Sequence, residues 1–361
     1  MRTIYLLASL LLCMSCVHKA DKKYYAGSIH EFTLPKDTVF LSGEKIALDK
    51  YAGSYVEAYD SLLIFQNFGQ TSHAFEVYNA FTQKSIGSFL PKGHGSGETP
   101  YVASIYHIYK ENGEVKTILF GAVESKIYIW NISRSLKEGK TVIEKSFKYE
   151  WRDETPGGYL DLVKTGEDTF VAYVPGVRVN NADIRLPHLQ ERTLSNNRLV
   201  KKIDMFKEVP SDAIKRKYLT EFLFDSYSCV SHDAKKIIQV MAYMGQIDFI
   251  DIETGEIDGY RIKGTYNFSI FDTEMDDVSH YYHRVKTNGK HVFALWCGKR
   301  LDEVKKFSFN TLHVFDMKGK CKKIVKLDSS VSDITIDPVH NILYGIDEED
   351  IYCYRLEETG L

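Results

Sequence analysis

The chain has 361 residues, of which 44% are hydrophobic and 26% charged, and its formal net charge is −3. A charge of this sign and size leaves no basic field to hold a nucleic-acid backbone, which argues against nucleic acid as a partner. The hydrophobic content is ample for a large core, and the 24 Tyr and 20 Phe favour strands over helices.

The first 16 residues have the form of an export signal. Arg2 gives a short positive region, and an apolar stretch follows from Ile4 to Met14, too short to span a bilayer. Ser15 then places a small residue before Cys16. This end resembles the lipobox of bacterial lipoproteins, although Cys13 stands where Leu is usual, and it implies that Cys16 is lipidated and becomes the mature N-terminus. The alternative is ordinary cleavage, which would leave a soluble periplasmic protein.

An apolar pair that opens a short strand recurs six times, at intervals of 50 to 67 residues. The pairs are Leu62-Leu63, Ile118-Leu119, Phe170-Val171, Ile237-Ile238, Val292-Phe293 and Ile342-Leu343. After most pairs comes a second strand with the pattern apolar-x-apolar-apolar-(Asn/Asp)-apolar, as in Ile247–Ile252. The Asn or Asp is expected to end this strand by hydrogen-bonding the backbone of a turn. With one strand before each pair and one after the turn, each repeat supplies four strands.

Six repeats of four strands predict an all-β fold, a six-bladed β-propeller. The sixth repeat ends near Leu356 without room for a fourth strand, whereas an unassigned strand lies at Ile29–Leu34 or Thr38–Leu48. Because a closed ring leaves no free sheet edge, we expect this N-terminal strand to complete the last blade. Residues 29–361 then form one propeller domain, joined to the signal by a linker at 17–28.

The third repeat is irregular. A polar stretch that contains Ser195-Asn196-Asn197 follows Val174-Pro175-Gly176, and a short helix is predicted from Ser211 to about Leu219. We interpret this region as a small helical insertion in blade three that lies on one propeller face, where long insertions often carry function. The alternative is a long connection without a function of its own.

A glycine-rich loop, Gly93-His94-Gly95-Ser96-Gly97-Glu98, follows the outer strand of the first repeat. Neither nucleotide-binding fingerprint fits it, so the residues alone favour an inter-blade turn formed by Gly93, Gly95, Gly97 and Glu98. The loop resembles the G-x-G-x-G-E loop of TolB-like six-bladed propeller lipoproteins of Gram-negative bacteria, and Leu41–Ile46 resembles their pre-blade segment. His94 and Ser96 replace the Arg and Pro common there. The resemblance covers residues 30 to 356 and implies a propeller in the cell envelope, anchored at the outer membrane, with no established reaction.

Two clusters contain residue types that bind metals elsewhere. The acidic run Asp272–Asp277, with Asp276, lacks the Gly and the final acid of a helix-flanked calcium loop, so a solvated loop is favoured over a calcium site. His280 and His283 are three residues apart in a predicted strand and should point to opposite faces unless a turn intervenes. We therefore predict no cofactor and no metal, with calcium as the alternative.

The sequence favours a non-catalytic envelope lipoprotein that attaches to the membrane by its lipid and binds an unidentified protein or glycan partner. The competing hypothesis is a propeller enzyme, lactonase- or hydrolase-like and calcium-dependent, with its site at the axial channel. A third is a sensor-like structural subunit of an envelope complex. The candidate residues for an axial site are His232, Asp233, Asp276, His280 and His283. The four remaining cysteines form either disulfides or free thiols: Cys229, Cys297, Cys321 and Cys353.

Overall fold

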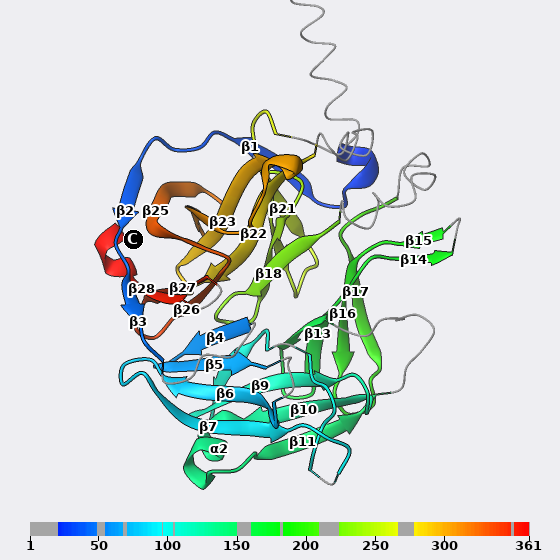
Figure 1. Cartoon of the computed structure of the whole chain (residues 1–361). Coiled ribbons are helices and arrows are strands. Elements are labelled where there is room, and N and C mark those ends of the chain that lie inside the picture. Colours follow the sequence, from blue (N-terminus) through cyan, green and yellow to red (C-terminus); the bar gives the residue numbers. More distant parts are fainter. Residues whose placement is uncertain are drawn as a thin grey trace, which may run out of the picture.

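A computed structural model describes residues 21–48, 55–67, 71–95, 97–103, 105–149, 160–180, 183–208, 224–265, 278–347 and 350–360. Six sheets surround a central axis, which confirms the predicted six-bladed propeller (Figure 1). Blade one contains β4 (Tyr55–Tyr59), β5 (Leu62–Gln66), β6 (His73–Asn79) and β7 (Lys84–Pro91). Blade two contains β8 (Ile108–Glu111), β9 (Glu114–Gly121), β10 (Lys126–Asn131) and β11 (Ile143–Lys148). Blade three contains β12 (Leu160–Lys164), β13 (Thr169–Val174), β16 (His188–Thr193) and β17 (Leu199–Asp204).

The other three blades each gain a strand from the N-terminal segment. Blade four contains β18 (Ser226–Val230), β19 (Lys236–Met241), β20 (Gln246–Asp251) and β21 (Ile257–Ile262), with β1 (Ser28–Phe32) added. Blade five contains β22 (Ser279–Thr287), β23 (His291–Arg300), β24 (Phe309–Asp316) and β25 (Cys321–Val331), with β2 (Thr38–Leu41) added. Blade six contains β26 (Asp333–Asp337), β27 (Ile342–Asp347) and β28 (Asp350–Arg355), with β3 (Glu44–Ile46) as its fourth strand.

The repeated sequence signals have the structural roles that were predicted. Each apolar pair lies in the second strand of its blade and is largely buried, as with Leu63 and Leu343 at 0% exposure. The Asn or Asp at the end of the third strand turns the chain in several blades. Asn79 Oδ1 accepts from Thr82 N at 2.8 Å, and Asp251 Oδ1 accepts from Thr254 N at 2.8 Å. The sequence pattern therefore specifies both the buried strand and the turn that follows.

Blade six is closed by the N-terminal segment, as predicted. Strand β3 pairs antiparallel with β28, so that Ile46 lies opposite Ile351 and Glu44 opposite Cys353. Side chains also seal the seam between the last blade and the first. Asp337 accepts from the backbone N–H groups of Asp60 and Ser61, at 3.0 and 2.9 Å. The ring is therefore joined by a shared sheet and by polar contacts across the seam.

The N-terminal segment does more than close the ring. Before it reaches blade six, it adds β1 to the outer edge of blade four and β2 to the outer edge of blade five, both parallel to their neighbours β21 and β25. We call residues 21–48 the N-terminal strap, visible as the blue ribbon that runs along the outside of these blades in Figure 1. The strap covers two edges that would otherwise present unpaired backbone groups.

Blades two and three depart from the plain repeat. In blade two, Asn131 caps a short helix, α2 (Ile132–Glu138), by accepting from Arg134 N at 2.8 Å. In blade three, a hairpin of β14 (Val177–Asn180) and β15 (Asp183–Arg185) is inserted between the second and third strands. Within the described part of the chain the blade-three insertion is therefore a β-hairpin, and the helix predicted at 211–219 lies outside the described residues.

The core lies in the seams between blades. Trp130 is fully buried and stacks on Phe75 with ring centroids 5.1 Å apart. Its indole N–H donates to Ser135 Oγ at 2.9 Å, so the buried polar atom is satisfied. All four cysteines outside the signal are free thiols; Cys229 and Cys297 are buried, and the other two are partly exposed. No helix among the described residues is both long and apolar enough to cross a bilayer.

Candidate functional site

The face of the propeller that carries the turn at 231–235 contains a groove between blades two and three, which we call the interblade groove. Its volume is about 750 Å³, within the usual range of small-ligand pockets. Blade four also contributes to it, through the β18–β19 turn. The charged residues that line it are Glu111, Glu144, Glu167, Asp233, Lys116, Lys145 and Lys164. Four acids and three bases leave the wall close to neutral, and the partly exposed Phe147 adds apolar area.

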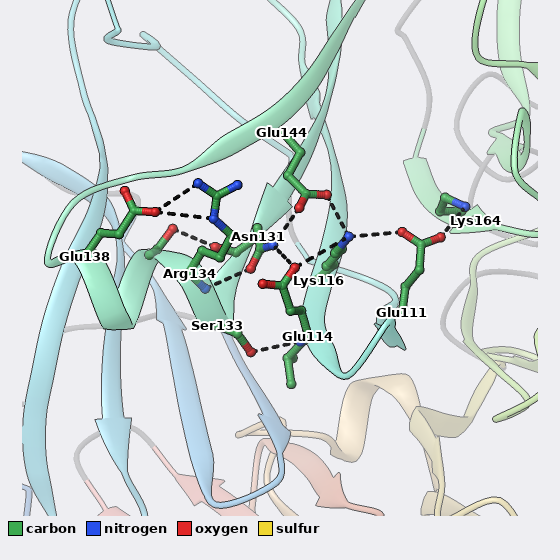
Figure 2. A network of polar contacts seen from close by, with 11 residues as sticks. Glu111, Glu114, Lys116, Asn131, Ser133, Arg134, Glu138, Glu144 and Lys164 are labelled. Carbon is green, nitrogen blue, oxygen red and sulfur yellow. Dashed lines mark hydrogen bonds and ion pairs between the residues drawn. The ribbon is translucent and has the colours of Figure 1, made fainter.

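Lys116 is at the centre of the polar network in this groove, shown in Figure 2. Its Nζ lies 2.7 Å from Glu144 Oε2 and 3.1 Å from Glu111 Oε2. Glu111 also contacts Lys164 Nζ at 3.3 Å, so this one carboxylate joins blade two to blade three. Asn131 Nδ2 donates to Glu144 Oε1 and Glu114 Oε2, both at 2.7 Å. Glu111, Glu144, Lys116 and Lys164 therefore hold one another in position before any ligand arrives.

The ionisation of this network follows from its contacts. Burial alone would raise the pKa of Glu111, but hydrogen bonds from Lys116 and Lys164 hold that pKa below its usual value. The pKa of Glu144 is likewise low, because the bonds from Lys116 and Asn131 outweigh the effect of burial. Burial would lower the pKa of Lys116, and the two carboxylates raise it instead. All three groups are therefore charged at neutral pH, and none is poised to exchange a proton.

The groove adjoins a smaller cavity of about 80 Å³ at the mouth of the axial channel, and His107 and His232 line both. His107 Nδ1 accepts from the backbone N–H of Lys164 at 3.2 Å, so its remaining nitrogen carries the proton. Burial lowers the pKa of His107 to about 4, with smaller effects from His232 and Lys164. The histidine is thus a neutral hydrogen-bond donor at the boundary between groove and cavity.

Polar side chains from several blades fill the axial channel below this mouth. Lys286 of blade five forms an ion pair with Glu57 of blade one, and Arg284 Nε donates to Asp333 Oδ1 at 2.9 Å. On the other side, Ser228 Oγ donates to Asp161 Oδ2 at 3.0 Å. Burial raises the pKa of Asp161 to about 6, against the effect of the Ser228 bond. The two ion pairs connect blade five with blades one and six.

The structure does not bring the sequence-predicted axial residues together. His232 and Asp233 lie in the β18–β19 turn beside the groove, where Asp233 Oδ1 accepts from Ser231 Oγ at 2.6 Å. His280 and His283 lie toward the opposite end of the channel, in the first half of β22. There His280 contacts the ring of Tyr243, a residue of the β19–β20 turn on the other propeller face.

The two histidines of β22 differ from the expectation that they point to opposite faces. Their ring centroids are 5.4 Å apart. The cause is a bulged strand, because the pairing with β23 shifts register twice between His280 and Arg284. Both rings are buried among aromatic side chains such as Phe309, and burial followed by Arg284 lowers their pKa values to about 4 and about 3. Within the described ranges, no three His, Cys, Asp or Glu side chains gather as metal ligands do.

The glycine-rich loop lies between β7 and β8, and thus connects two blades. Glu98 folds back over it and accepts from Gly95 N at 2.9 Å. A Cβ atom at Gly93 would overlap this carboxylate, and Gly97 has a φ of 81°. The glycines are therefore explained by the close approach of Glu98 and by a left-handed turn. Three other predicted features lie outside the described residues: the lipobox with Cys16, Ser96, and the acidic loop with Asp276.

Sequence analysis did not identify the interblade groove, because its residues come from three blades and form no local motif. Lys116 stands in a strand where a charged residue interrupts an apolar run, Val115-Lys116-Thr117-Ile118. A lysine at a buried strand position requires carboxylate partners, and this requirement is the signal in the sequence that could have indicated a buried polar network. Its partners Glu111 and Glu144 are separated from it by turns and by α2, so the sequence does not indicate which carboxylates they are.

No family model matches the chain, and no curated protein matches its sequence. Among solved structures, it is similar to a member of the DUF4221 family from Bacteroides vulgatus, with 11% identity and a TM-score of 0.52 over 90% of this chain and 94% of the other. It is also similar to a protein from Bacteroides fragilis whose name describes it as exported, with 10% identity and a TM-score of 0.53 over 91% and 98% of the two chains. At these identities the likeness shows the fold alone. Neither name mentions the TolB-like family, so that resemblance stays a prediction.

Proposed function

We propose that this protein is an exported, lipid-anchored binding protein of the cell envelope, which captures a glycan in the interblade groove. The observation that carries the proposal is the composition of the groove wall. Four acids and three bases leave it almost uncharged, yet rich in donors and acceptors, beside the partly exposed ring of Phe147. An uncharged ligand with many hydroxyl groups uses such a wall better than an anion or a cation does.

The export and lipid anchoring in this proposal rest on separate observations. The apolar stretch and Ser15-Cys16 at the N-terminus have the form of a lipoprotein signal. The name of the Bacteroides fragilis structure that shares this fold describes that protein as exported. Lipidation at Cys16 would retain the propeller at the membrane after export, where envelope and surface glycans are within reach.

The test is direct binding of a defined panel of envelope and host oligosaccharides to the purified propeller, measured by calorimetry. We expect one class to bind and Glu111→Gln to weaken it at least tenfold, because the change removes the negative charge that Lys116 and Lys164 share. The matched control is Glu256→Gln, an exposed carboxylate on blade four outside the groove. Binding that Glu111→Gln leaves unchanged would place the ligand elsewhere.

Two other outcomes would replace the proposal. Binding of an envelope protein that the panel does not compete with, and that Glu111→Gln abolishes, would make the groove a protein-binding surface. Calcium-dependent turnover of a lactone or ester would establish the enzyme alternative. The channel residues that a propeller enzyme would use, such as Glu57 and Asp333, are instead engaged with Lys286 and Arg284.

A further inference from the structure

The first described residues of the chain are firmly docked on the propeller. The carboxylate of Asp21 accepts two hydrogen bonds from Arg261 Nη1, at 2.9 and 3.0 Å, and both side chains are buried. Tyr25 Oη donates to the buried Asp248 Oδ1 at 2.7 Å. Removing either partner of such a buried pair would leave an uncompensated polar group, so the contact is held strongly. The N-terminal strap is therefore fixed to blade four from Asp21 onward.

The backbone around these residues is fixed as well, against the segment that leaves β17. Ala26 N donates to Met205 O at 3.0 Å, and Lys207 N donates to Tyr24 O at 2.8 Å. Asp21 lies near Arg261 and Gln246, at the end of blade four that carries the turn at 242–245. This is the propeller face opposite the one with the interblade groove. In Figure 1, the blue turn at the start of the strap lies beside β17 and the β14–β15 hairpin.

We propose that the propeller rests on the bilayer by the surface around this docked N-terminus, with the groove facing away from the membrane. The inference rests on the lipid anchoring at Cys16 that is part of the proposed function. Only residues 17 to 20 lie between Cys16 and Asp21. Five Cα–Cα steps of a fully extended chain span at most roughly 18 Å. A lipidated Cys16 in the bilayer therefore keeps Asp21 within that distance of the membrane surface.

The chemistry of this surface fits anionic lipid headgroups. We call it the anchor-side surface and define it by Lys22, Lys23, Arg185, Lys202 and Lys207. Lys207 Nζ donates to Lys22 O at 3.0 Å, and Arg185, Lys202 and Lys207 line a groove of about 740 Å³ beside the strap residue Ala26. Two carboxylates, Asp204 and Glu208, offset part of this charge and leave an excess of three cations. The negative surface potential of an anionic bilayer attracts cations that lie close to it.

The experiment uses the full-length lipidated protein in phosphatidylethanolamine/phosphatidylglycerol vesicles, with amide hydrogen exchange as the readout. Compared with the soluble Cys16→Ala protein, we expect slower exchange at 22–27 and 204–208. Exchange in the turns at 288–290 and 317–320, on the groove face, should not change. Replacing phosphatidylglycerol by phosphatidylcholine should reduce the protection, because the cations then lose their partners.

Two variants test the orientation of the propeller on the bilayer. Ten Gly/Ser residues inserted between Ala20 and Asp21 should leave the protein on the vesicles and remove the protection at 22–27. Lys22→Gln with Lys23→Gln and Lys207→Gln should reduce it, whereas the matched control, Lys290→Gln with Lys318→Gln and Lys320→Gln on the groove face, should not. Equal protection on both faces, or protection that survives the insertion, would overturn the orientation while leaving the anchor intact. A wild-type protein without an acyl chain by mass spectrometry would refute the anchor, and the orientation with it.

Discussion

Replacement of Asp161 by asparagine should stabilise the protein, and more so at pH 7 than at pH 4.5. Burial raises the pKa of this carboxyl group from 3.8 to about 6, so the folded state binds more protons than the unfolded state between these two values. Stability is therefore lost as the pH rises through this window, and the loss is complete above pH 6. Asparagine has no proton to lose, and its amide oxygen can still accept from Ser228 Oγ.

The size of the effect follows from the shift in pKa. The pKa of Asp161 differs by about 2 units between the folded and unfolded states. At 1.36 kcal/mol per unit, this difference destabilises the folded state by about 3 kcal/mol at pH 7. At pH 4.5 most of the folded molecules already carry the proton on Asp161, and the same linkage gives a destabilisation of only about 1 kcal/mol. The advantage of Asp161→Asn over the wild type should therefore grow by about 2 kcal/mol between these pH values.

Urea unfolding of both proteins at pH 4.5, 6 and 7, followed by intrinsic fluorescence, measures this difference. The matched control is Glu256→Gln, an exposed carboxylate in the β20–β21 turn of blade four. An advantage that stays constant with pH, or a variant that is less stable than the wild type at pH 7, would refute the reasoning. The second result would mean that the channel needs a charge at Asp161.

Four further outcomes are expected. Cys16→Ala should move the folded protein from the membrane to the soluble fraction; a wild type that is already soluble would contradict the anchor. Deletion of residues 21–50 should lower the urea midpoint and speed hydrogen exchange in β28 above all, because blade six loses β3, and an unchanged midpoint would count against closure. Trp130→Ala should lower the unfolding free energy by about 3–5 kcal/mol, which is the usual effect of truncating a fully buried aromatic side chain. The purified protein should show no hydrolase or oxidoreductase turnover, with or without calcium or zinc.

The repeated signals were sufficient to predict the propeller. Apolar pairs such as Leu63 mark the buried second strand, and Asp251 marks the turn after the third, because each acts on its own neighbours. The helix α2 was missed although its signals are present. Asn131 caps it, and Gly139 ends it with a φ of 66°. Asn131 also ends strand β10 at the Asn/Asp position of the repeated pattern, so the signal for a strand end and the signal for a helix start overlap at one residue.

What the sequence did not reveal depends on contacts between distant segments. The pairing of β1 with β21 and of β2 with β25 joins strands more than 200 residues apart, and nothing local identifies those partners. The groove has the same origin, since Glu111 meets Lys164 only once blades two and three are side by side. The bulge that brings His280 and His283 together depends on the partner strand β23, so the two-residue periodicity of a regular strand was the wrong guide there.

The N-terminal strap also dictates the order in which the molecule can be completed. The strap leaves the ribosome before the blades do, yet its partners β21, β25 and β28 all belong to the second half of the chain. Ile46 meets Ile351 only across a loop of about 300 residues, a contact whose closure entropy makes it slow to form. The strap must therefore remain unpaired while the blades form, and the ring locks last. A propeller with this topology therefore stays open until its last blade has been synthesised.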